Sequence, residues 1–318
     1  MAGFIGILRT GAWLTRERLR LVALALVAAS IIGAGYLVAT SDGLNDRLGR
    51  PLGTDFSNVY AAGTYVLDGK AAKPFDPSAQ FAREKTIFGS STQFYGWHYP
   101  PFFLGVAALL ALMPYAMALA LWQGVTLLLY LWAVHGIFGI ARKSNDHLWL
   151  LLALAFPAVF INLGHGHNGF LTAALFGGAL IALERTPVVA GVLFGLLAYK
   201  PQFGVLIPLV LVASGRWRAF VSAAATVAAL ALAVTLAFGP QVWTAFLAST
   251  KFTRTVVLEQ GETGWHKIQS VFSWVRMWDG SVTLAYAVQG AITVAVAVAL
   301  IWIWRSRASF SVKAAALL

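Results

Sequence analysis

LRLVALALVAASIIGAGYLVAT, residues 19–40, is the stretch that decides the fold of this chain. It holds 22 residues, about the number that a helix needs to cross a hydrocarbon layer of roughly 30 Å. Arg9, Arg16 and Arg18 precede it. The run is longer than the core of a signal peptide, and no small-residue cleavage pattern lies nearby. We therefore expect an uncleaved first span with a cytoplasmic N-terminus.

The composition extends this prediction to the whole chain. Of its 318 residues, 59% are hydrophobic and 11% are charged, which excludes most soluble folds. Further apolar runs lie at 101–113, 116–141, 147–163, 169–183, 187–199, 202–213, 217–238 and 282–304. Runs of 12 or 13 residues reach only about 20 Å as a helix, so we expect 101–113, 187–199 and 202–213 to be half-helices, tilted, or shielded by neighbours. The sequence predicts an all-α polytopic membrane protein with one transmembrane domain over residues 1–318.

Two segments, about 41–100 and about 239–281, are too polar for the lipid interior. The loops that alternate with them, together with the N-terminus, carry 12 basic and 3 acidic residues, 12 − 3 = +9, whereas the other set carries 11 − 9 = +2. Because cytoplasmic loops are enriched in Lys and Arg, we expect both segments on the non-cytoplasmic side, as outer loops 1 and 2. A complete crossing by 101–113 would put Arg142 and Lys143 outside, so we expect 101–113 to dip into the membrane or to form one broken span with 116–141.

The charge balance and the missing motifs exclude several classes of function. The net charge is 23 − 12 = +11, but the basic residues stand between apolar spans, so we interpret them as membrane anchors and expect no nucleic-acid partner. Cys is absent, which removes disulfides and thiolate metal sites. The sequence has no Asp-x-Asp pair, no phosphate loop and no Gly-x-Ser-x-Gly elbow. These absences argue against an enzyme that hydrolyses nucleotides and against a hydrolase with a serine nucleophile.

Outer loop 1 opens with a predicted helix that carries a candidate catalytic acid. Thr54 can cap a helix that begins at Asp55, where the positive end of the helix dipole keeps a carboxylate ionised. Such a carboxylate near lipid headgroups can accept a proton from a sugar hydroxyl, although an ordinary helix N-terminal acid fits the same pattern. The spacing predicts a flat-lying helix with one apolar face, Phe56, Val59, Tyr60, Gly63, Val66 and Leu67, and a second face with Asp55, Asn58 and Tyr65.

The rest of outer loop 1 supplies a second helix and an interfacial motif. Asp76 followed by Pro77 predicts a helix start, and Gly89 can end that helix. The segment WHYPP, which ends outer loop 1, combines interfacial aromatic residues with a proline pair that fixes the start of the next apolar run. His98 and Tyr99 within it are either substrate contacts or hydrogen-bonded residues of the interface.

The break GHGHNG, residues 164–169, holds two histidines close together. His165 and His167 could bind zinc in a loop, but no Cys or acidic residue lies nearby. We therefore expect no metal site. His165, His167 and Asn168 are instead candidate donors to a sugar or phosphate oxygen.

The break YKPQ, residues 199–202, places an ionisable residue in an apolar stretch. Lys200 has no acidic residue within seven positions on either side. A lysine in this setting is usually functional unless it snorkels to the interface. A cation at the outer face suits an anionic lipid phosphate, and Gln202 beside it is a candidate substrate contact.

Outer loop 2 mixes charged and aromatic residues, as carbohydrate and headgroup sites do. Glu259 is a candidate substrate contact in this loop. Lys267 and Arg276 are candidates for a second cation at a lipid phosphate. A solvated lid without a binding role fits the same composition.

Four segments, in this order, resemble glycosyltransferase family 87: TDFSNVYAAG at 54–63, YPPFF at 99–103, GHNGFL at 166–171 and GLLAYKPQ at 195–202. Characterised members of that family are polyprenol-phosphate-mannose-dependent α-mannosyltransferases. The resemblance implies a C-type glycosyltransferase fold, a multi-span helical body with juxtamembrane helices in the first outer loop. Many relatives have Gln at the position of His167. The family continues for several more spans, and this chain stops as a new apolar helix begins, so we expect C-terminal spans to be missing.

The resemblance also implies a chemistry. In it Asp55 matches the general base, which takes a proton from the attacking hydroxyl, and Lys200 matches a position beside the donor phosphate. We expect transfer of a hexose, mannose by resemblance, from a polyprenyl-phosphate donor to a hydroxyl of a glycolipid or glycan. An anionic lipid phosphate is already a competent leaving group, so in-line attack would invert the anomeric carbon without a metal or other cofactor. The expected location is the periplasmic side of a bacterial inner membrane, where membrane lipids surround the site.

Two other classes of function stay open. A lipid or sugar transporter would need polar groups at the bilayer midplane and two related halves, whereas the charges cluster at one face and no internal repeat is visible. A non-catalytic assembly subunit of the membrane would keep the spans without needing Asp55. Loss of transfer on replacing Asp55 would separate the enzyme from both alternatives.

Overall fold

The computed structural model describes residues 10–11, 13–140 and 147–318. These residues are helical and contain no β-strand beyond two isolated bridges within 42–51. They divide into two compact units, each of which is described by itself. Three of the basic residues used in the charge argument, Arg9, Arg142 and Lys143, lie outside the described residues.

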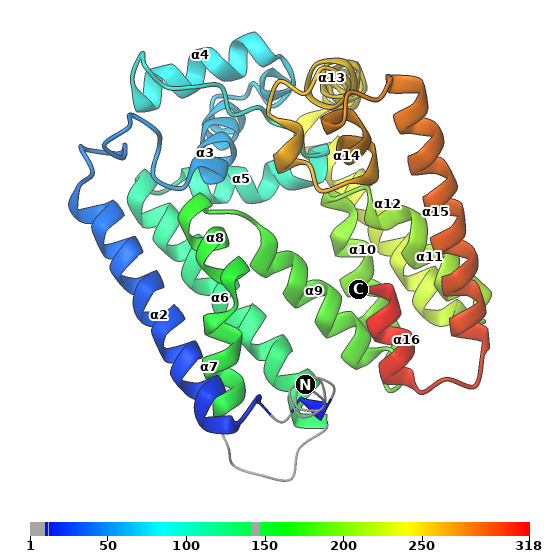
Figure 1. Ribbon diagram of the computed structural model, residues 1–318. Coiled ribbons are helices and arrows are strands. Elements are labelled where there is room, and N and C mark those ends of the chain that lie inside the picture. The colour runs from blue at the N-terminus through cyan, green and yellow to red at the C-terminus, as the bar shows by residue number, and fades with distance from the viewer. Residues whose placement is uncertain (1–9, 12, 141–146) are drawn as a thin grey trace. The chain divides into compact units, whose positions relative to one another are not determined.

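Unit 1 comprises Met1–Val59, Glu84–Tyr95 and Met113–Gly177. It contains two long apolar helices, α2 (Arg16–Ala39) and α6 (Tyr115–Ile140), both long enough to cross a membrane (Figure 1). Only 6% of the most apolar stretch of α2 is buried within the protein, which leaves its side chains for contact with lipid. α2 confirms the predicted first span.

A bent pair of helices follows in the same unit. The sequence predicts one run over 147–163, but the structure has α7 (Leu148–Ala155) and α8 (Pro157–His165), bent by 53° at Phe156. Pro157 explains the break, because proline forces the residue before it into an extended conformation and cannot continue a helix. α9 (Gly169–Ala182) then begins after a left-handed turn at Gly166.

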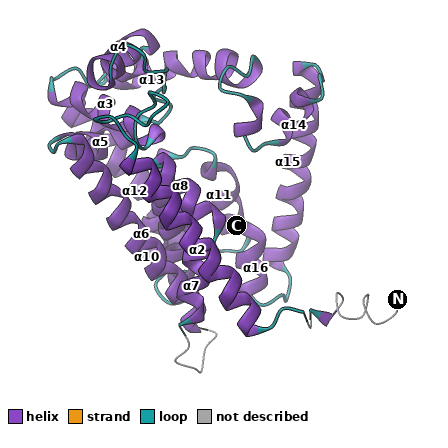
Figure 2. Ribbon diagram, turned by 60° about the vertical axis from the view of Figure 1, so that its left-hand side comes forward, coloured by secondary structure: helices purple, strands orange, loops and turns teal. Residues whose placement is uncertain are grey.

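Unit 2 comprises Tyr60–Arg83, Gly96–Leu112 and Gly178–Leu318. Its two long helices are α12 (Trp217–Phe238) and α15 (Val282–Arg305), and the shorter ones, α10 (Pro187–Leu196) and α11 (Phe203–Ala213), span only about 15 Å (Figure 2). α10 packs closely on α12 through Gly191 and Gly195, since a Cβ on Gly191 would lie 2.3 Å from the Ala219 carbonyl oxygen.

α5 (Leu104–Ala111) is preceded by a short 3₁₀ turn, η2 (Pro101–Phe103). Its 8 residues measure about 12 Å, so α5 is too short to cross a bilayer. Whether 101–113 dips into the membrane or forms one broken span with 116–141 stays a prediction.

Outer loop 1 contains α3 (Thr54–Leu67), η1 (Lys73–Phe75) and α4 (Pro77–Phe88). The start of α4 is confirmed, because the Asp76 carboxylate accepts hydrogen bonds from Ser78 N–H at 3.0 Å and Ser78 Oγ at 2.7 Å. α3 begins at Thr54, one residue earlier than predicted.

The helix predicted from this spacing is present, but burial does not follow the two predicted faces. Asn58 and Tyr65 of the second face are buried, whereas Leu67 of the apolar face is 48% exposed. Tertiary contacts are the physical reason. Tyr65 Oη reaches the Ala79 carbonyl oxygen at 2.8 Å, so a side of the helix that looks polar in the sequence is covered.

Outer loop 2 is built from α13 (Gln241–Phe252), a π-helix over Thr253–Glu259, η5 (Trp265–Lys267) and α14 (Val271–Met277). The remaining described elements are η3 (Leu197–Tyr199) and the C-terminal helix α16 (Phe310–Leu317).

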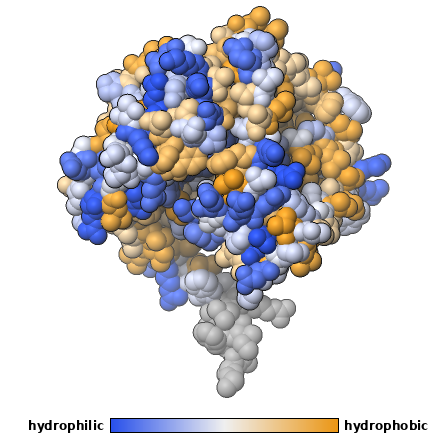
Figure 3. Space-filling view, turned by 90° about the horizontal axis from the view of Figure 1, so that it is seen from above, coloured by the Kyte–Doolittle hydropathy of each residue, from blue (hydrophilic) through white to orange (hydrophobic). Residues whose placement is uncertain are grey.

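Seen from above, hydrophilic side chains interrupt the hydrophobic surface (Figure 3). Within the described part of the chain, four helices, or five if α7 and α8 count as one span, are long and apolar enough to cross a membrane, so the protein is an all-α, multi-pass membrane protein.

Candidate functional site

The turn before α3 is fixed by contacts with α6 inside unit 1. Tyr115 Oη donates hydrogen bonds to the carbonyl oxygens of Leu52 and, at 3.3 Å, of Gly53. Gly53 has a φ of +70°, and a Cβ on it would lie 2.8 Å from Leu119 Cδ1. No larger residue therefore fits at Gly53 without strain. These contacts set the first turn of α3, in which Asp55 is half-buried.

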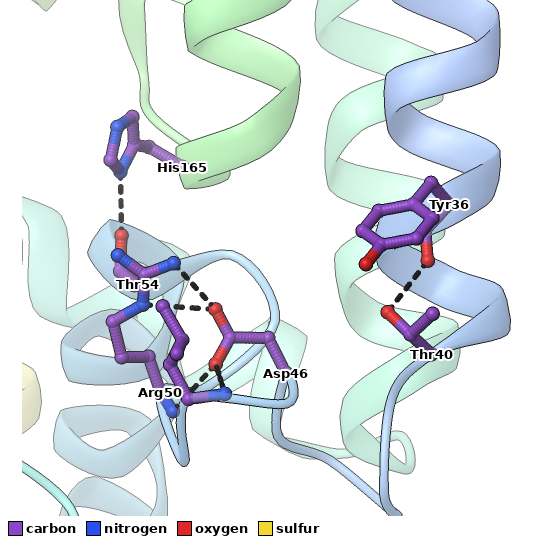
Figure 4. Close-up of polar contacts among 7 residues, drawn as sticks. Tyr36, Thr40, Asp46, Arg50, Thr54 and His165 are labelled. Atoms are coloured by element: carbon purple, nitrogen blue, oxygen red, sulfur yellow. Dashed lines mark hydrogen bonds and ion pairs between the residues drawn. The ribbon is translucent and has the colours of Figure 1, made fainter.

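The turn between α8 and α9 packs against the same place. Thr54 Oγ1 and His165 Nδ1 lie 2.7 Å apart, and His165 points at Thr54 in Figure 4. Gly166 has a φ of +63°, and a Cβ on it would lie 2.6 Å from Cβ of the fully buried Phe56. The structure thus brings the predicted residues Asp55 and His165 into one region of unit 1.

The other two candidates from this turn belong to the same region. Asn168 is buried, with 3% of its surface exposed, and His167 is half-buried. Gln123 of α6 holds the end of α8, because its Nε2 donates hydrogen bonds to the Asn162 and Leu163 carbonyl oxygens at 3.1 and 2.8 Å. This support makes the turn a rigid part of unit 1 rather than a loose loop.

An ion pair lies just before α3. Asp46 is 7% exposed and accepts hydrogen bonds from Arg50 Nε at 2.9 Å and Nη2 at 2.7 Å, as Figure 4 shows, and from the N–H of Leu48 and of Arg50. Burial alone would raise the pKa of Asp46, but the hydrogen bonds and the charge of Arg50 outweigh burial and lower that pKa below its usual value. Asp46 therefore stays ionised and orients Arg50.

Tyr95 is the third polar group of this region. Burial raises the pKa of the Tyr95 phenol, the positive charge of Arg50 opposes this, and the negative charges of Asp46, Asp55 and Glu84 raise it further. The Asp55 carboxylate is therefore close enough to Tyr95 for its charge to change the pKa of the phenol. Tyr95 therefore remains a protonated hydrogen-bond donor at neutral pH.

Unit 2 holds the remaining candidate residues. Tyr60 lies on the part of α3 that belongs to unit 2, and burial raises the pKa of its phenol. His98 Nδ1 lies 3.0 Å from Thr253 Oγ1, which ties the end of outer loop 1 to the π-helix of outer loop 2. The protein atoms around the imidazole lower the pKa of His98 by desolvation, although part of the residue is solvent-exposed.

Aromatic rings hold the backbone at Lys200. The rings of Phe103 and Tyr199 are stacked at 4.9 Å, and Tyr99 lies 6.5 Å from Tyr199. Lys200 follows Tyr199 directly, is half-buried, and donates its N–H to the Leu197 carbonyl oxygen at 2.8 Å. The structure therefore brings together the predicted residues Tyr99 and Lys200. Gln202 is exposed just before α11.

Arg276 is the centre of a network within outer loop 2. Its Nη1 donates to the Gly280 carbonyl oxygen at 2.6 Å and its Nη2 to the Glu259 carbonyl oxygen at 3.2 Å, while its guanidinium lies 4.7 Å from the Trp265 ring. The Glu259 carboxylate accepts from Arg254 Nε at 3.0 Å and Tyr286 Oη at 2.9 Å. Lys267 is exposed in η5. Glu259 and Arg276 thus have a structural role in the loop, whatever they contact in a substrate.

The comparisons with known proteins concern most of the chain. The model of glycosyltransferase family 87 matches residues 97–318, more than two thirds of the sequence. The chain belongs to glycosyltransferase family 87. No curated protein and no solved structure matches it.

Membership in glycosyltransferase family 87 makes this protein a membrane glycosyltransferase, with a sugar donor and an acceptor as substrates. The matched residues include the turn at His165 and the segment around Lys200, whereas Asp55 precedes them. The structural contacts of unit 1, rather than the family match, therefore connect Asp55 to the matched part of this transferase.

The sequence analysis of this transferase missed Arg50 and Tyr95 beside Asp55. The spacing of Asp46 and Arg50 could have indicated an ion pair, but nothing local to Tyr95 connects it with Asp55, which lies 40 residues earlier (95 − 55 = 40). Among the described residues, no group of three or more His, Asp or Glu side chains is arranged to hold a metal ion.

Proposed function

We propose that this family-87 glycosyltransferase moves a hexose from a polyprenyl-phosphate donor to a hydroxyl of a glycolipid or glycan. Mannose is the sugar that the family resemblance implies. The observation that carries the proposal is the environment of Asp55, a half-buried carboxylate in the first turn of α3 with Arg50, Tyr95 and the His165 turn in the same unit. We place this site on the periplasmic side of a bacterial inner membrane, with the N-terminus in the cytoplasm.

In the proposed reaction, Asp55 is the general base. Its carboxylate takes the proton of the acceptor hydroxyl as that oxygen attacks the anomeric carbon of the donor. The bond from the anomeric carbon to the phosphate oxygen breaks, and polyprenyl phosphate leaves with the electron pair. Attack from the side opposite the phosphate inverts the anomeric carbon, and the proton resides on Asp55 until solvent removes it.

Neighbouring groups would orient the acceptor. Tyr95 can donate a hydrogen bond to an acceptor oxygen, and Arg50 adds positive charge where the acceptor binds. His165, His167, Asn168 and Tyr60 are proposed sugar contacts. His98, Tyr99, Gln202 and Glu259 are proposed contacts in unit 2.

Lys200 would bind the donor phosphate. A lysine ammonium pairs well with a phosphate at the edge of the membrane, where charges are incompletely screened. Lys267 and Arg276 are candidates for a second cation. Since a phosphate monoanion or dianion is a stable leaving group, the reaction as proposed needs no metal ion to assist departure.

Replacement of Asp55 by Asn tests the base. This change keeps the shape of the side chain and removes the proton acceptor, so we expect transfer to fall at least about 100-fold. The measurement follows radiolabelled sugar from a polyprenyl phosphate into lipid extracts of membranes that contain the protein. Asp42→Asn, an exposed acid of the same loop, is the matched control and should retain transfer. Undiminished transfer by Asp55→Asn would show that Asp55 is not the general base.

Lys200→Met tests the donor side. The substitution keeps a long apolar stem and removes the ammonium, so we expect the KM for the polyprenyl-phosphate donor to rise about 10-fold, with a smaller change in KM for the acceptor. Initial rates at varied donor and acceptor concentrations separate the two. An unchanged donor KM would contradict a role for Lys200 at the phosphate.

A further inference from the structure

A groove opens between α2 and α7 at the end of unit 1 where both helices begin. The two helices lie against each other in both views (Figures 1 and 2). The groove has a volume of about 730 Å³, within the roughly 300–1,000 Å³ of small-molecule sites. It lies toward the opposite end of α2 from outer loop 1, because the 15 residues of α2 that follow Leu24 (39 − 24 = 15) span about 22 Å. It is therefore separate from the region around Asp55.

The lining of this groove has two parts. Arg16, Arg20 and Leu24 follow one face of α2 at intervals of four residues. Arg16 and Arg20 form a basic rim together with His147 at the start of α7, and Glu17 is the acidic residue of the lining. Leu24 and several leucines of α7, among them Leu151, form an apolar wall that continues from the rim toward the middle of the two helices. Two arginines against one acid leave the rim positive.

This combination selects for a ligand that is both anionic and apolar. A small phosphate would pair with the arginines but leave the leucines uncovered. A neutral lipid would cover the leucines but bring no negative charge to Arg16 and Arg20. A phospholipid with an anionic head group satisfies both parts, and basic pockets between membrane helices are known to hold such head groups.

We infer that the groove between α2 and α7 binds an anionic phospholipid, with the phosphate at Arg16 and Arg20 and the upper acyl chain along Leu24 and Leu151. By the charge distribution of the loops, this is the cytoplasmic leaflet. The site does not depend on the proposed function. The proposed lipid would contact α2 at residues that have no part in the proposed glycosyl transfer.

Native mass spectrometry of the full chain, with phosphatidylglycerol and phosphatidylcholine added in equal amounts, tests the inference. We expect preferential retention of phosphatidylglycerol, reduced about fivefold in Arg20→Gln and further in Arg16→Gln/Arg20→Gln, since each basic residue near an anionic head group contributes roughly that factor. Arg18→Gln is the matched control, because Arg18 carries the same charge on the same helix, lies outside the groove and donates to the Trp13 carbonyl oxygen at 3.1 Å. It should retain the lipid within about twofold.

A second variant tests the apolar wall. Leu151→Trp keeps every charge and fills the groove, so it should also lower retention of phosphatidylglycerol, while the melting temperature of the delipidated protein confirms that the variant folds. Glycerol phosphate at millimolar concentration should fail to displace the lipid. Equal loss in Arg18→Gln and Arg20→Gln would overturn the inference. So would equal retention of phosphatidylcholine, or displacement by glycerol phosphate alone.

Discussion

Around Asp55, two glycines of unit 1 lie so close to neighbouring side chains that an added Cβ would clash, whereas in outer loop 2 of unit 2 the side chain of Arg276 is the centre of a polar network. Gly53 and Gly166 have positive φ values and no room for a Cβ. Arg276 instead joins the π-helix, η5 and the end of α14 through two hydrogen bonds and one ring contact. The first region is fixed by steric exclusion, and the second by polar contacts that one substitution can remove.

This difference has a functional meaning for a transferase. A general base must be held within a fraction of an ångström of its proton donor, so the close packing before α3 suits the role proposed for Asp55. A loop that admits a bulky substrate must open and close, and the contacts around Arg276 can be broken at modest cost. We therefore expect the turn before α3 to be more rigid than outer loop 2.

The largest effect is expected for Gly166→Ala. Its Cβ would meet Phe56 Cβ at 2.6 Å in a left-handed conformation, so unfolding should become easier by roughly 2–4 kcal/mol. Gly164→Ala is the matched control two residues earlier, because no heavy atom lies within 4 Å of the added Cβ. Thermal melting in detergent compares the two variants. If both melt alike, the turn before α3 is not fixed by steric exclusion.

A smaller, local effect is expected for Arg276→Gln. Loss of the two carbonyl contacts and of the Trp265 contact should destabilise outer loop 2 by about 1–3 kcal/mol. Hydrogen exchange should therefore rise over 253–280, with little change in unit 1. Lys267→Gln removes the same charge from an exposed position of the same loop and should leave exchange unchanged. Equal exchange in wild type and Arg276→Gln would show that other contacts hold the loop.

Elements that depend on local sequence were predicted well. The predicted run 217–238 has the same bounds as α12, and the predicted run 282–304 ends one residue before the end of α15. Both agree because the length of an apolar run and its flanking polar residues define a span locally. Asp76 and Pro77 begin α4 as predicted, since an N-cap and a first-turn proline act within a few residues. The multi-pass fold could therefore be predicted from the sequence alone.

Features that depend on distant residues could not be predicted. Asn58 and Tyr65 looked polar on α3 but are buried by partners elsewhere in the chain. The charge of Asp55 raises the pKa of Tyr95, which lies 40 residues later (95 − 55 = 40), and no spacing rule connects the two residues. Arg276 has the charge expected of a phosphate ligand, yet its contacts organise a loop. Residue type predicted the chemistry of these side chains but not their partners.

The smallest expected effect concerns His98, which connects the end of outer loop 1 to the π-helix of outer loop 2. Burial lowers the pKa of His98 below its usual 6.5, so the folded protein binds a proton there less readily than the unfolded chain. Well above pH 6.5, both the folded protein and the unfolded chain have a neutral His98, so His98 does not change the stability there. As the pH falls below that value, the unfolded chain takes up the proton first, and stability is lost.

The expected loss is under about 1 kcal/mol between pH 7.5 and 5.5, because solvent reaches part of the side chain. His98→Gln should remove this part of the pH dependence of melting, whereas the exposed His266→Gln should keep it. Hydrogen exchange over 253–259 should rise at pH 5.5 in the wild type and not in His98→Gln. If the variant keeps the wild-type pH dependence, His98 does not couple the two outer loops.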